Sequence, residues 1–186
     1  MKPTVLIGTS GEPGTFTEGV IRAMGAAVER PVVFPMSNPT SKTEAHPKDI
    51  LEWTNGRALV ATGSPFDPVT RGDRTFRIGQ GNNAFVFPGV GLGALISQAR
   101  EVTDEMFASA ALALAHSVTD EDIASGSLFP RIRELRRVAA RVAAAVVRTA
   151  RDQGLGRAIK DEDIEAVVAN AMWEPQYGPY DLAPFV

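Results

Sequence analysis

The sequence contains no cysteine and only two histidines, two tryptophans and two tyrosines among its 186 residues. Without cysteine the chain can form no disulfide, thiolate nucleophile or cysteine-ligated metal site. No apolar run approaches the roughly 20 residues that cross a bilayer, and the apolar N-terminal stretch is too short for a signal peptide. The net charge of -3 gives no general reason to expect nucleic-acid binding. We therefore expect a cytoplasmic protein that binds neither membrane nor nucleic acid.

The remaining composition is typical of a globular protein, with 44% hydrophobic and 22% charged residues. No internal repeat, low-complexity segment or linker divides the chain. We predict one domain over residues 1–186, in which residues 1–90 form a sheet with helices and residues 91–186 are mostly helical.

Three apolar runs in the first half have the character of buried strands, at residues 4–7, 32–34 and 58–62. They recur at intervals of roughly 25 to 30 residues with helical patterns between them, which is the spacing of a parallel βαβαβ unit. The prediction is an α/β fold with a partial Rossmann-like parallel sheet, followed by a C-terminal helical region. In such a sheet the loops that follow the strands share one edge.

Capping patterns place the helices. Thr15 and Glu18 fit a capping box for a helix from about Phe16, and a shorter helix is expected at residues 47–53. Residues 67–78 look like an exposed loop or hairpin. Thr103 and Thr119 are candidate N-caps and Gly154 a candidate C-cap. The second half should form helices at residues 91–98, 104–116, 120–124, 131–153 and 161–172.

Three polar loops follow apolar runs and predict one binding site. They are Ser37-Asn38-Pro39-Thr40, Gly63-Ser64-Pro65-Phe66 and Gly79-Gln80-Gly81-Asn82-Asn83. Glycine lets backbone approach a ligand closely, and asparagine offers both donors and acceptors. The loops bring no acid, base or nucleophile, so the chemistry is that of recognition. Taken alone, Asn38 is more typical of an Asx-turn, and the asparagines of the third loop shift the balance towards binding.

Two glycine-rich segments resemble cofactor loops. Residues 79–84 match the G-x-G-x-x-G/A fingerprint, but we expect no helix to start at Asn82 and continue through Phe87-Pro88-Gly89, so the phosphate-binding helix is missing. Residues 8–14 lie between a strand and a helix. Their Gly8, Ser10 and Gly11 either contact a cofactor or form a tight turn, and the sequence does not decide between the two.

Other polar features have simpler interpretations. His46 and His116 are expected to be structural, and the acidic runs at residues 120–122 and 161–163 suit the first turns of helices. Arginines on one face of the helix at residues 131–153 could meet an acidic surface, but a packed helix with a solvated basic face explains them better.

The chain resembles malic enzyme, specifically the later part of its NAD(P)-binding domain and the helices that follow. The resemblance covers residues 2–153 strongly and the tail loosely. Its motifs are Lys2-Pro3-Thr4-Val5-Leu6-Ile7-Gly8, Phe16-Thr17-Glu18, Ser37-Asn38-Pro39-Thr40, Gly56-Arg57-Ala58-Leu59-Val60-Ala61-Thr62-Gly63-Ser64-Pro65-Phe66, Gly79-Gln80-Gly81-Asn82-Asn83 and Phe87-Pro88-Gly89-Val90.

The resemblance implies oxidative decarboxylation of malate to pyruvate and CO2, with NAD or NADP as cofactor and Mg or Mn as metal. It also implies that Asn38, Asn82 and Asn83 contact substrate or the nicotinamide, with Gly8, Ser10, Gly11, Ser37, Gly63 and Ser64 as candidate cofactor-loop residues. The family's catalytic Tyr and Lys and its metal-binding acids belong to preceding sequence and are absent here. No catalytic or metal-binding role is assigned, since Tyr177 and Tyr180 lie in the variable tail.

The isolated chain is therefore expected to be inactive and to need the missing N-terminal part of malic enzyme. An unpaired edge strand and an uncovered apolar face predict a homo-oligomer. The alternative is a stand-alone, non-catalytic protein derived from malic enzyme that binds a nucleotide or assists assembly. The choice between NAD and NADP stays open, because the residue that reads the adenosine ribose follows an earlier strand.

Overall fold

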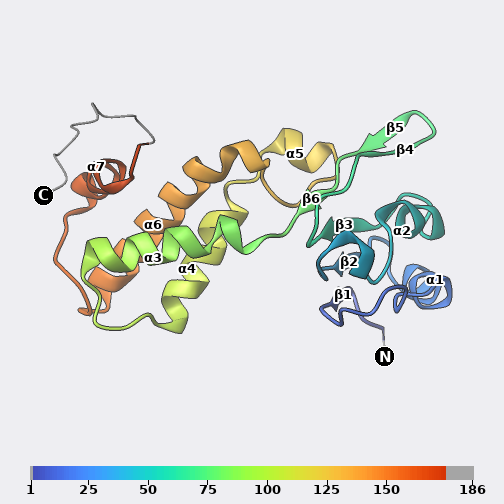
Figure 1. The fold of residues 1–186 in the computed structure, drawn as a ribbon, viewed down its shortest axis with the longest axis horizontal. Helices are drawn as coiled ribbons and strands as arrows, with labels where there is room; N and C mark the ends of the chain where they lie inside the picture. Colours follow the sequence, from blue (N-terminus) through green and yellow to red (C-terminus); the bar gives the residue numbers. More distant parts are fainter. Residues whose placement is uncertain (1, 175–186) are drawn as a thin grey trace, which may run out of the picture.

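The computed structural model describes residues 2–174, which form an elongated molecule with two lobes (Figure 1). We call residues 2–80 the sheet lobe and residues 83–174 the helical lobe. The sheet lobe contains α1 (Glu18–Ala27), α2 (Pro47–Trp53), the short 3-10 helix η1 (Thr40–Lys42) and all the strands. The predicted succession of a parallel sheet and then helices is confirmed.

The sheet has four parallel strands in the order β1-β2-β3-β6, so each strand pairs with the one before it in that series. Their bounds are β1 (Val5–Gly8), β2 (Val32–Pro35), β3 (Leu59–Thr62) and β6 (Gly79–Gln80). The fourth strand was not predicted, because two residues of this kind carry no apolar pattern. The C-terminal ends of all four strands lie at one edge.

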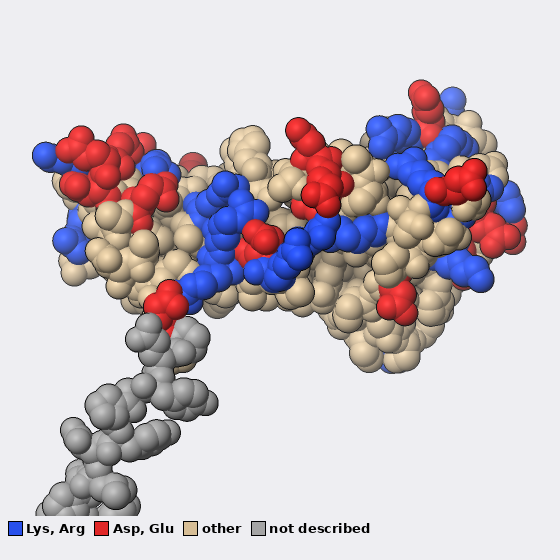
Figure 2. All heavy atoms as spheres, turned by 90° about the horizontal axis from the view of Figure 1, so that it is seen from above, with Lys and Arg blue, Asp and Glu red and all other residues tan. Residues whose placement is uncertain are grey.

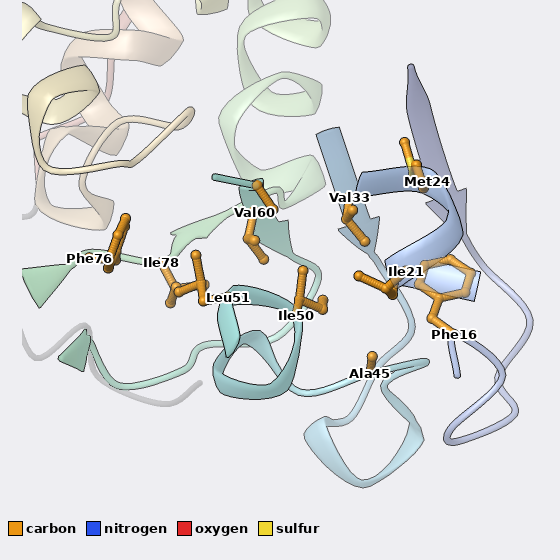
Figure 3. Close-up of a cluster of buried hydrophobic side chains, with 11 residues drawn as sticks. Phe16, Ile21, Met24, Val33, Ala45, Ile50, Leu51, Val60, Phe76 and Ile78 are labelled. Carbon is orange, nitrogen blue, oxygen red and sulfur yellow. The ribbon is translucent and has the colours of Figure 1, made fainter. Parts of the chain in front are cut away.

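Helices α1 and α2 cover one face of the sheet and enclose the core of this lobe (Figure 3). Ile21 of α1 and Ile50 of α2 are fully buried with Val33 of the sheet. The predicted cap of α1 is wrong: the side chain of Thr17, not Thr15, accepts from an amide of the first turn, and the helix begins at Glu18. α2 has the predicted bounds, with Pro47 in its first turn.

The opposite face of β1 is open. Val5 and Ile7 alternate along this strand, so they share a face, and they are 47% and 60% exposed. Parallel sheets normally have both faces covered. The expectation of an uncovered apolar face is met at this edge strand within the described residues.

The segment after β3 contains the expected hairpin. Strands β4 (Val69–Arg71) and β5 (Arg74–Phe76) pair in antiparallel register, with Arg71 opposite Arg74. Phe76 turns into the sheet-lobe core, whereas the tip of the hairpin is exposed.

In the helical lobe, α6 (Leu135–Asp152) is the central helix, and α3 (Phe87–Ser97), α4 (Asp104–Ala115) and α7 (Asp161–Ala171) pack around it. A methyl group on Gly93 would lie 2.7 Å from Cβ of Val146, so the absent side chain lets α3 approach α6 closely. The lobe is completed by α5 (Asp120–Ala124), η2 (Asn83–Phe85) and η3 (Ile132–Glu134).

The helix boundaries were mostly predicted, with α3 as the main error. It begins at Phe87, because Pro88 fits the first helical turn and Gly89 packs against Val142. The predicted start at residue 91 is therefore four residues too late, whereas the expectation that no helix starts at Asn82 and continues through these residues is confirmed. Thr103 and Thr119 are confirmed as N-caps, and Gly154 adopts a φ of +67° just after α6.

Within the part of the chain that the structure describes, none of the helices is both long and apolar enough to cross a membrane.

Candidate functional site

The three predicted loops meet at the edge where the parallel strands end. Asn38 follows β2, Ser64 follows β3 and Asn82 follows β6, and these three strands are neighbours. Two strand spacings separate β2 from β6, or about 10 Å. A small ligand can span that distance, and open parallel sheets bind ligands at this edge.

The side chain of Asn38 ties two of these loops together. Asn38 is exposed, and its Oδ1 accepts a hydrogen bond from the hydroxyl of Ser64, which lies 26 positions later in the chain. Its recorded partner is thus a neighbouring loop and not an amide of its own loop, which disagrees with the Asx-turn alternative. The amide of Asn38 is held at the protein surface by a buried serine.

Gly63 permits the close approach of the loops after β2 and β3. A Cβ atom on Gly63 would lie 2.0 Å from the carbonyl oxygen of Met36 and 3.1 Å from Nδ2 of Asn38. Gln80 of β6 donates from Nε2 to the Gly63 carbonyl at 3.1 Å. These contacts join β2, β3 and β6 at the site.

Asn82 and Asn83 take different positions. Asn82 is half-buried, and its Oδ1 accepts from the backbone N–H of Ala84 at 2.9 Å, which caps η2. Asn83 is exposed. The strand-to-helix context of the G-x-G-x-x-A match is interrupted by η2, and the longer helix α3 begins only at Phe87. The absence of a helix N-terminus directly at Asn82 agrees with the prediction.

The loop after β1 is folded inward. The Ser10 N–H donates to Glu44 at 2.8 Å, and the Gly11 N–H donates to the Ser37 hydroxyl at 2.9 Å. Gly8 is buried, and a Cβ there would collide with Phe16 and Glu44. Both amides are therefore engaged by side chains of the protein itself.

Glu44 is the central residue that the sequence analysis missed. Its side chain is fully buried, and its oxygens accept from the hydroxyl of Ser37 at 2.5 Å and that of Ser10 at 3.0 Å. Burial alone would raise the pKa of Glu44, but hydrogen bonds from Ser37 and Ser10 outweigh it and hold that pKa below its usual value. The only sequence signal was an acid among small polar residues after a predicted strand, which is too common to be diagnostic.

The described residues provide no metal centre. Within residues 2–174 there is no group of three His, Asp or Glu side chains that could hold a metal ion. His46 and His116 flank helix ends, and His46 packs edge-on against Phe66. Tyr177 and Tyr180 lie outside the described residues. The donor set at the strand ends, made of amides and hydroxyls, suits an organic ligand with carboxylate or carboxamide groups.

Four of the five arginines of α6 are paired with acids on the same lobe, namely Arg136, Arg137, Arg148 and Arg151. Arg148 contacts Glu165 at 3.0 Å, and Arg137 contacts Glu134 at 2.7 Å. Figure 2 shows acidic and basic side chains interspersed over one face of the molecule. The interpretation of a packed helix with a solvated basic face fits these contacts.

Comparisons with known proteins agree with this geometry. The family described as "Malic enzyme, NAD binding domain" matches residues 1–151. NAD-dependent malic enzymes of Shewanella denitrificans and Shewanella frigidimarina are 51% and 50% identical over 184 residues, which is 99% of this chain and 33% of each relative. The chain thus spans about a third of the length of these relatives.

A solved structure gives the same assignment. The crystal structure of malic enzyme from Pyrococcus horikoshii superposes with a TM-score of 0.66 at 30% identity, covering 91% of this chain and 35% of that one. The shared fold is Rossmann-like, with its ligand edge at the strand ends. The chain therefore belongs to the malic enzyme family and corresponds to its NAD-binding domain.

Proposed function

We propose that this chain supplies the nicotinamide- and substrate-binding edge of an NAD-dependent malic enzyme that converts malate to pyruvate and CO2. The observation that carries the proposal is the placement of Asn38 and of Asn82–Asn83 at the ends of β2 and β6, in a chain that matches the family over residues 1–151. NAD accepts the hydride when it is bound.

Each asparagine has a distinct part in this proposal. Asn38 is exposed and has its oxygen held by Ser64, so its amide Nδ2 is the donor proposed for a substrate carboxylate. Asn83, which is exposed, presents a complete amide that can pair with the nicotinamide carboxamide. Neutral amides orient both molecules without competing for the protons of the reaction.

The catalytic acid, base and metal ligands are proposed to lie in sequence outside this chain. The absence of a metal cluster among residues 2–174 supports this, and no reaction step is assigned to the residues described. A carbonyl polarised by Mg or Mn and positioned proton-transfer groups are what decarboxylation needs. The isolated chain is therefore proposed to bind but not to turn over.

The open face of β1 supports a role for the missing N-terminal part. Val5 and Ile7 would be covered if further sheet or helix packed there. Alone, the chain could cover them by forming a homo-oligomer. Sedimentation of the chain, with and without the remaining two-thirds of a malic enzyme, distinguishes these two arrangements. A cytoplasmic location remains a prediction.

The test is ligand binding and turnover by matched asparagine variants. In a polypeptide of the relatives' full length that contains this chain, Asn38→Ala and Asn83→Ala should each lower kcat/KM for malate by about 100-fold. The control Asn170→Ala changes an exposed asparagine of α7 in the other lobe and should change nothing. Equal activity of all three variants would refute the assignment.

The chain alone provides the second arm. Malate-dependent formation of NADH, followed at 340 nm, should be undetectable with the 186-residue chain. Turnover by this chain would overturn the proposal that the catalytic groups lie elsewhere. Calorimetric titration with NAD measures what binding capacity this third of the enzyme retains.

A further inference from the structure

Glu44 has an unusual environment for an ionised side chain. It is completely buried in the segment between η1 and α2. Among the described residues, no lysine, arginine or histidine lies within ion-pair distance of it. Four donors surround it instead: Ser10 N at 2.8 Å, Ser10 Oγ at 3.0 Å, Ser37 Oγ at 2.5 Å and Ser37 N at 3.3 Å.

These donors come from two loops. Ser10 follows β1 and Ser37 follows β2, whereas Glu44 belongs to neither strand. The bonds therefore join three segments that are 34 and 7 positions apart in the chain. A carboxylate surrounded only by donors holds these segments together firmly, because charged acceptors make shorter and stronger hydrogen bonds than neutral acceptors do. We call this group of hydrogen bonds the Glu44 junction.

The junction extends to a further amide and leads to the binding edge. The Ser37 hydroxyl donates to Glu44 and accepts from the Gly11 N–H at 2.9 Å, so its donor and acceptor capacities are both used. The next residue is Asn38, whose oxygen is fixed by Ser64 from the loop after β3. These hydrogen bonds, together with the peptide bond between Ser37 and Asn38, thus link the ends of β1, β2 and β3.

We infer that Glu44 is a positioning residue: by holding Ser10 and Ser37, it fixes the loops after β1 and β2 against each other and so sets the place of Asn38 at the ligand edge. The expected effect of Glu44 on ligand binding, through Asn38, rests on the proposed function. The structural part of the inference, the anchoring of the two loops, stands independently. Glu44 itself is completely buried, so we infer that it acts through Ser10 and Ser37 and not by direct contact with a ligand.

The chemistry predicts that even an isosteric change will disturb the junction. In Glu44→Gln, an amide NH2 replaces one acceptor oxygen. The new NH2 group then faces either the three donors that contact Oε1 or the Ser37 N–H that contacts Oε2, so that one donor points at another. The side-chain volume is unchanged, so packing against Gly8 and Phe16 is kept. The change therefore affects the hydrogen bonds and the negative charge of this side chain, and not its volume.

Amide hydrogen exchange of the 186-residue chain tests the anchoring. Glu44→Gln should lower protection of the Ser10, Gly11 and Ser37 amides by about tenfold or more relative to the rest of the sheet lobe. Should Glu44→Gln fail to fold, Ser10→Ala removes one donor from an exposed residue and should loosen the same amides less. Unchanged protection at these three amides would overturn the inference.

A matched control separates positioning from general loss of stability. Thr54→Val also removes a buried hydrogen-bonding group of the sheet lobe, since Thr54 is fully buried and donates to Ile50 O at 2.7 Å. Thr54 precedes β3 and lies at the opposite edge from the strand ends. Its loss should reduce stability without selective exposure of Ser10, Gly11 and Ser37.

Ligand binding in the full-length enzyme completes the test. Glu44→Gln should raise KM for malate by about tenfold, and Thr54→Val should leave it unchanged at a temperature where both variants are folded. A wild type that binds neither NAD nor malate would refute the proposed function, while hydrogen exchange would still report on the anchoring. Wild-type KM in a folded Glu44→Gln variant would refute the effect on Asn38.

Discussion

The two lobes use buried polar side chains in different ways. In the helical lobe, the buried hydroxyls of Ser97 and Ser117 donate to carbonyls four positions earlier in their own segments. In the sheet lobe, Ser37 and Ser64 bond to residues of other loops. The helix packing around α6 thus depends on the close fit of side chains, whereas the ligand edge of the sheet lobe is held by hydrogen bonds between distant segments.

This contrast teaches where each lobe is sensitive. Helix packing around α6 depends on small residues, and a single added carbon atom collides with backbone. At the strand ends, by contrast, an exchange of one polar atom leaves the volume unchanged and alters how loops are held. Mutations of the two kinds should therefore separate stability from binding.

The largest effect is expected from Gly93→Val in the helical lobe. The new Cβ would lie 2.8 Å from the Ala143 carbonyl oxygen and 2.7 Å from Cβ of Val146, so α3 must move away from α6. Chemical denaturation should show a loss of about 3 kcal/mol. In the same helix, Gly91 has open space around it, and Gly91→Ala should stabilise by about 0.5 to 1 kcal/mol. Equal changes in unfolding free energy for the two variants would refute the idea that α3 and α6 pack closely because Gly93 has no side chain.

Asp122→Asn probes the polar contact that joins the lobes. Asp122 is buried and binds Arg77 at 2.7 Å and Arg131 at 3.2 Å. Burial would raise the pKa of Asp122, but hydrogen bonds from Thr119 and Arg131 and the charge of Arg77 hold it below its usual value. Replacement should cost about 2 kcal/mol at pH 7.

The sign of the pH dependence follows from the lowered pKa of Asp122. The ionised form is favoured in the folded state, so its stabilisation is present above the unfolded pKa of about 4 and is lost as pH falls through the folded value. The difference in unfolding free energy between wild type and Asp122→Asn should therefore shrink as pH is lowered from 7 towards 3. A difference that is independent of pH would contradict an ionised Asp122.

Ser64→Ala tests the ligand edge itself. It removes the hydroxyl that holds Asn38, and we expect kcat/KM for malate in the full-length enzyme to fall about tenfold. Ser97→Ala removes a buried hydroxyl of the helical lobe and should leave kcat/KM unchanged. If Ser64→Ala and Ser97→Ala lower kcat/KM for malate equally, the hydrogen bond of Ser64 has no special role at the ligand edge.

The smallest effect is expected for an exposed ion pair. Arg22 and Glu18 lie one turn apart on α1 with an N–O distance of 2.6 Å, and both side chains are 54% exposed. Thermal unfolding of Arg22→Ala should reveal a change below about 0.5 kcal/mol that vanishes in high salt. A larger loss that salt does not alter would show that Arg22 stabilises α1 through the packing of its side chain and not through its charge.

Local patterns were sufficient for much of the fold. The apolar runs gave β1, β2 and β3, and the caps at Thr103 and Thr119 were read correctly because capping depends on a few neighbouring residues. Thr15 was chosen as the cap of α1 from its spacing to Glu18, whereas the structure uses Thr17, two residues later. The predicted helix began at residue 91, whereas α3 begins at Phe87, because Pro88 suits a first turn.

The candidate site was only partly accessible from sequence for a different reason. The strand-end loops carrying Asn38 and Asn82 could be predicted from topology. The partners of Glu44 and Asp122 could not, since the bonds from Ser10 and Arg77 span 34 and 45 positions. The acidic run that includes Asp122 was explained by the helix dipole, and its ion pairs need the folded chain. Hydrogen bonds and ion pairs between residues far apart in the chain produce no periodic pattern in a single sequence.

The strand order has a consequence for how this molecule forms. Each strand of the sheet pairs with the one before it in the order β1-β2-β3-β6, so no pairing has to wait for a distant later strand. Each pairing still joins residues 18 to 27 positions apart, and parallel pairing over such distances is slower than the formation of local helical contacts. During synthesis the sheet lobe can assemble progressively as it leaves the ribosome, before α6 and α7 exist to support it.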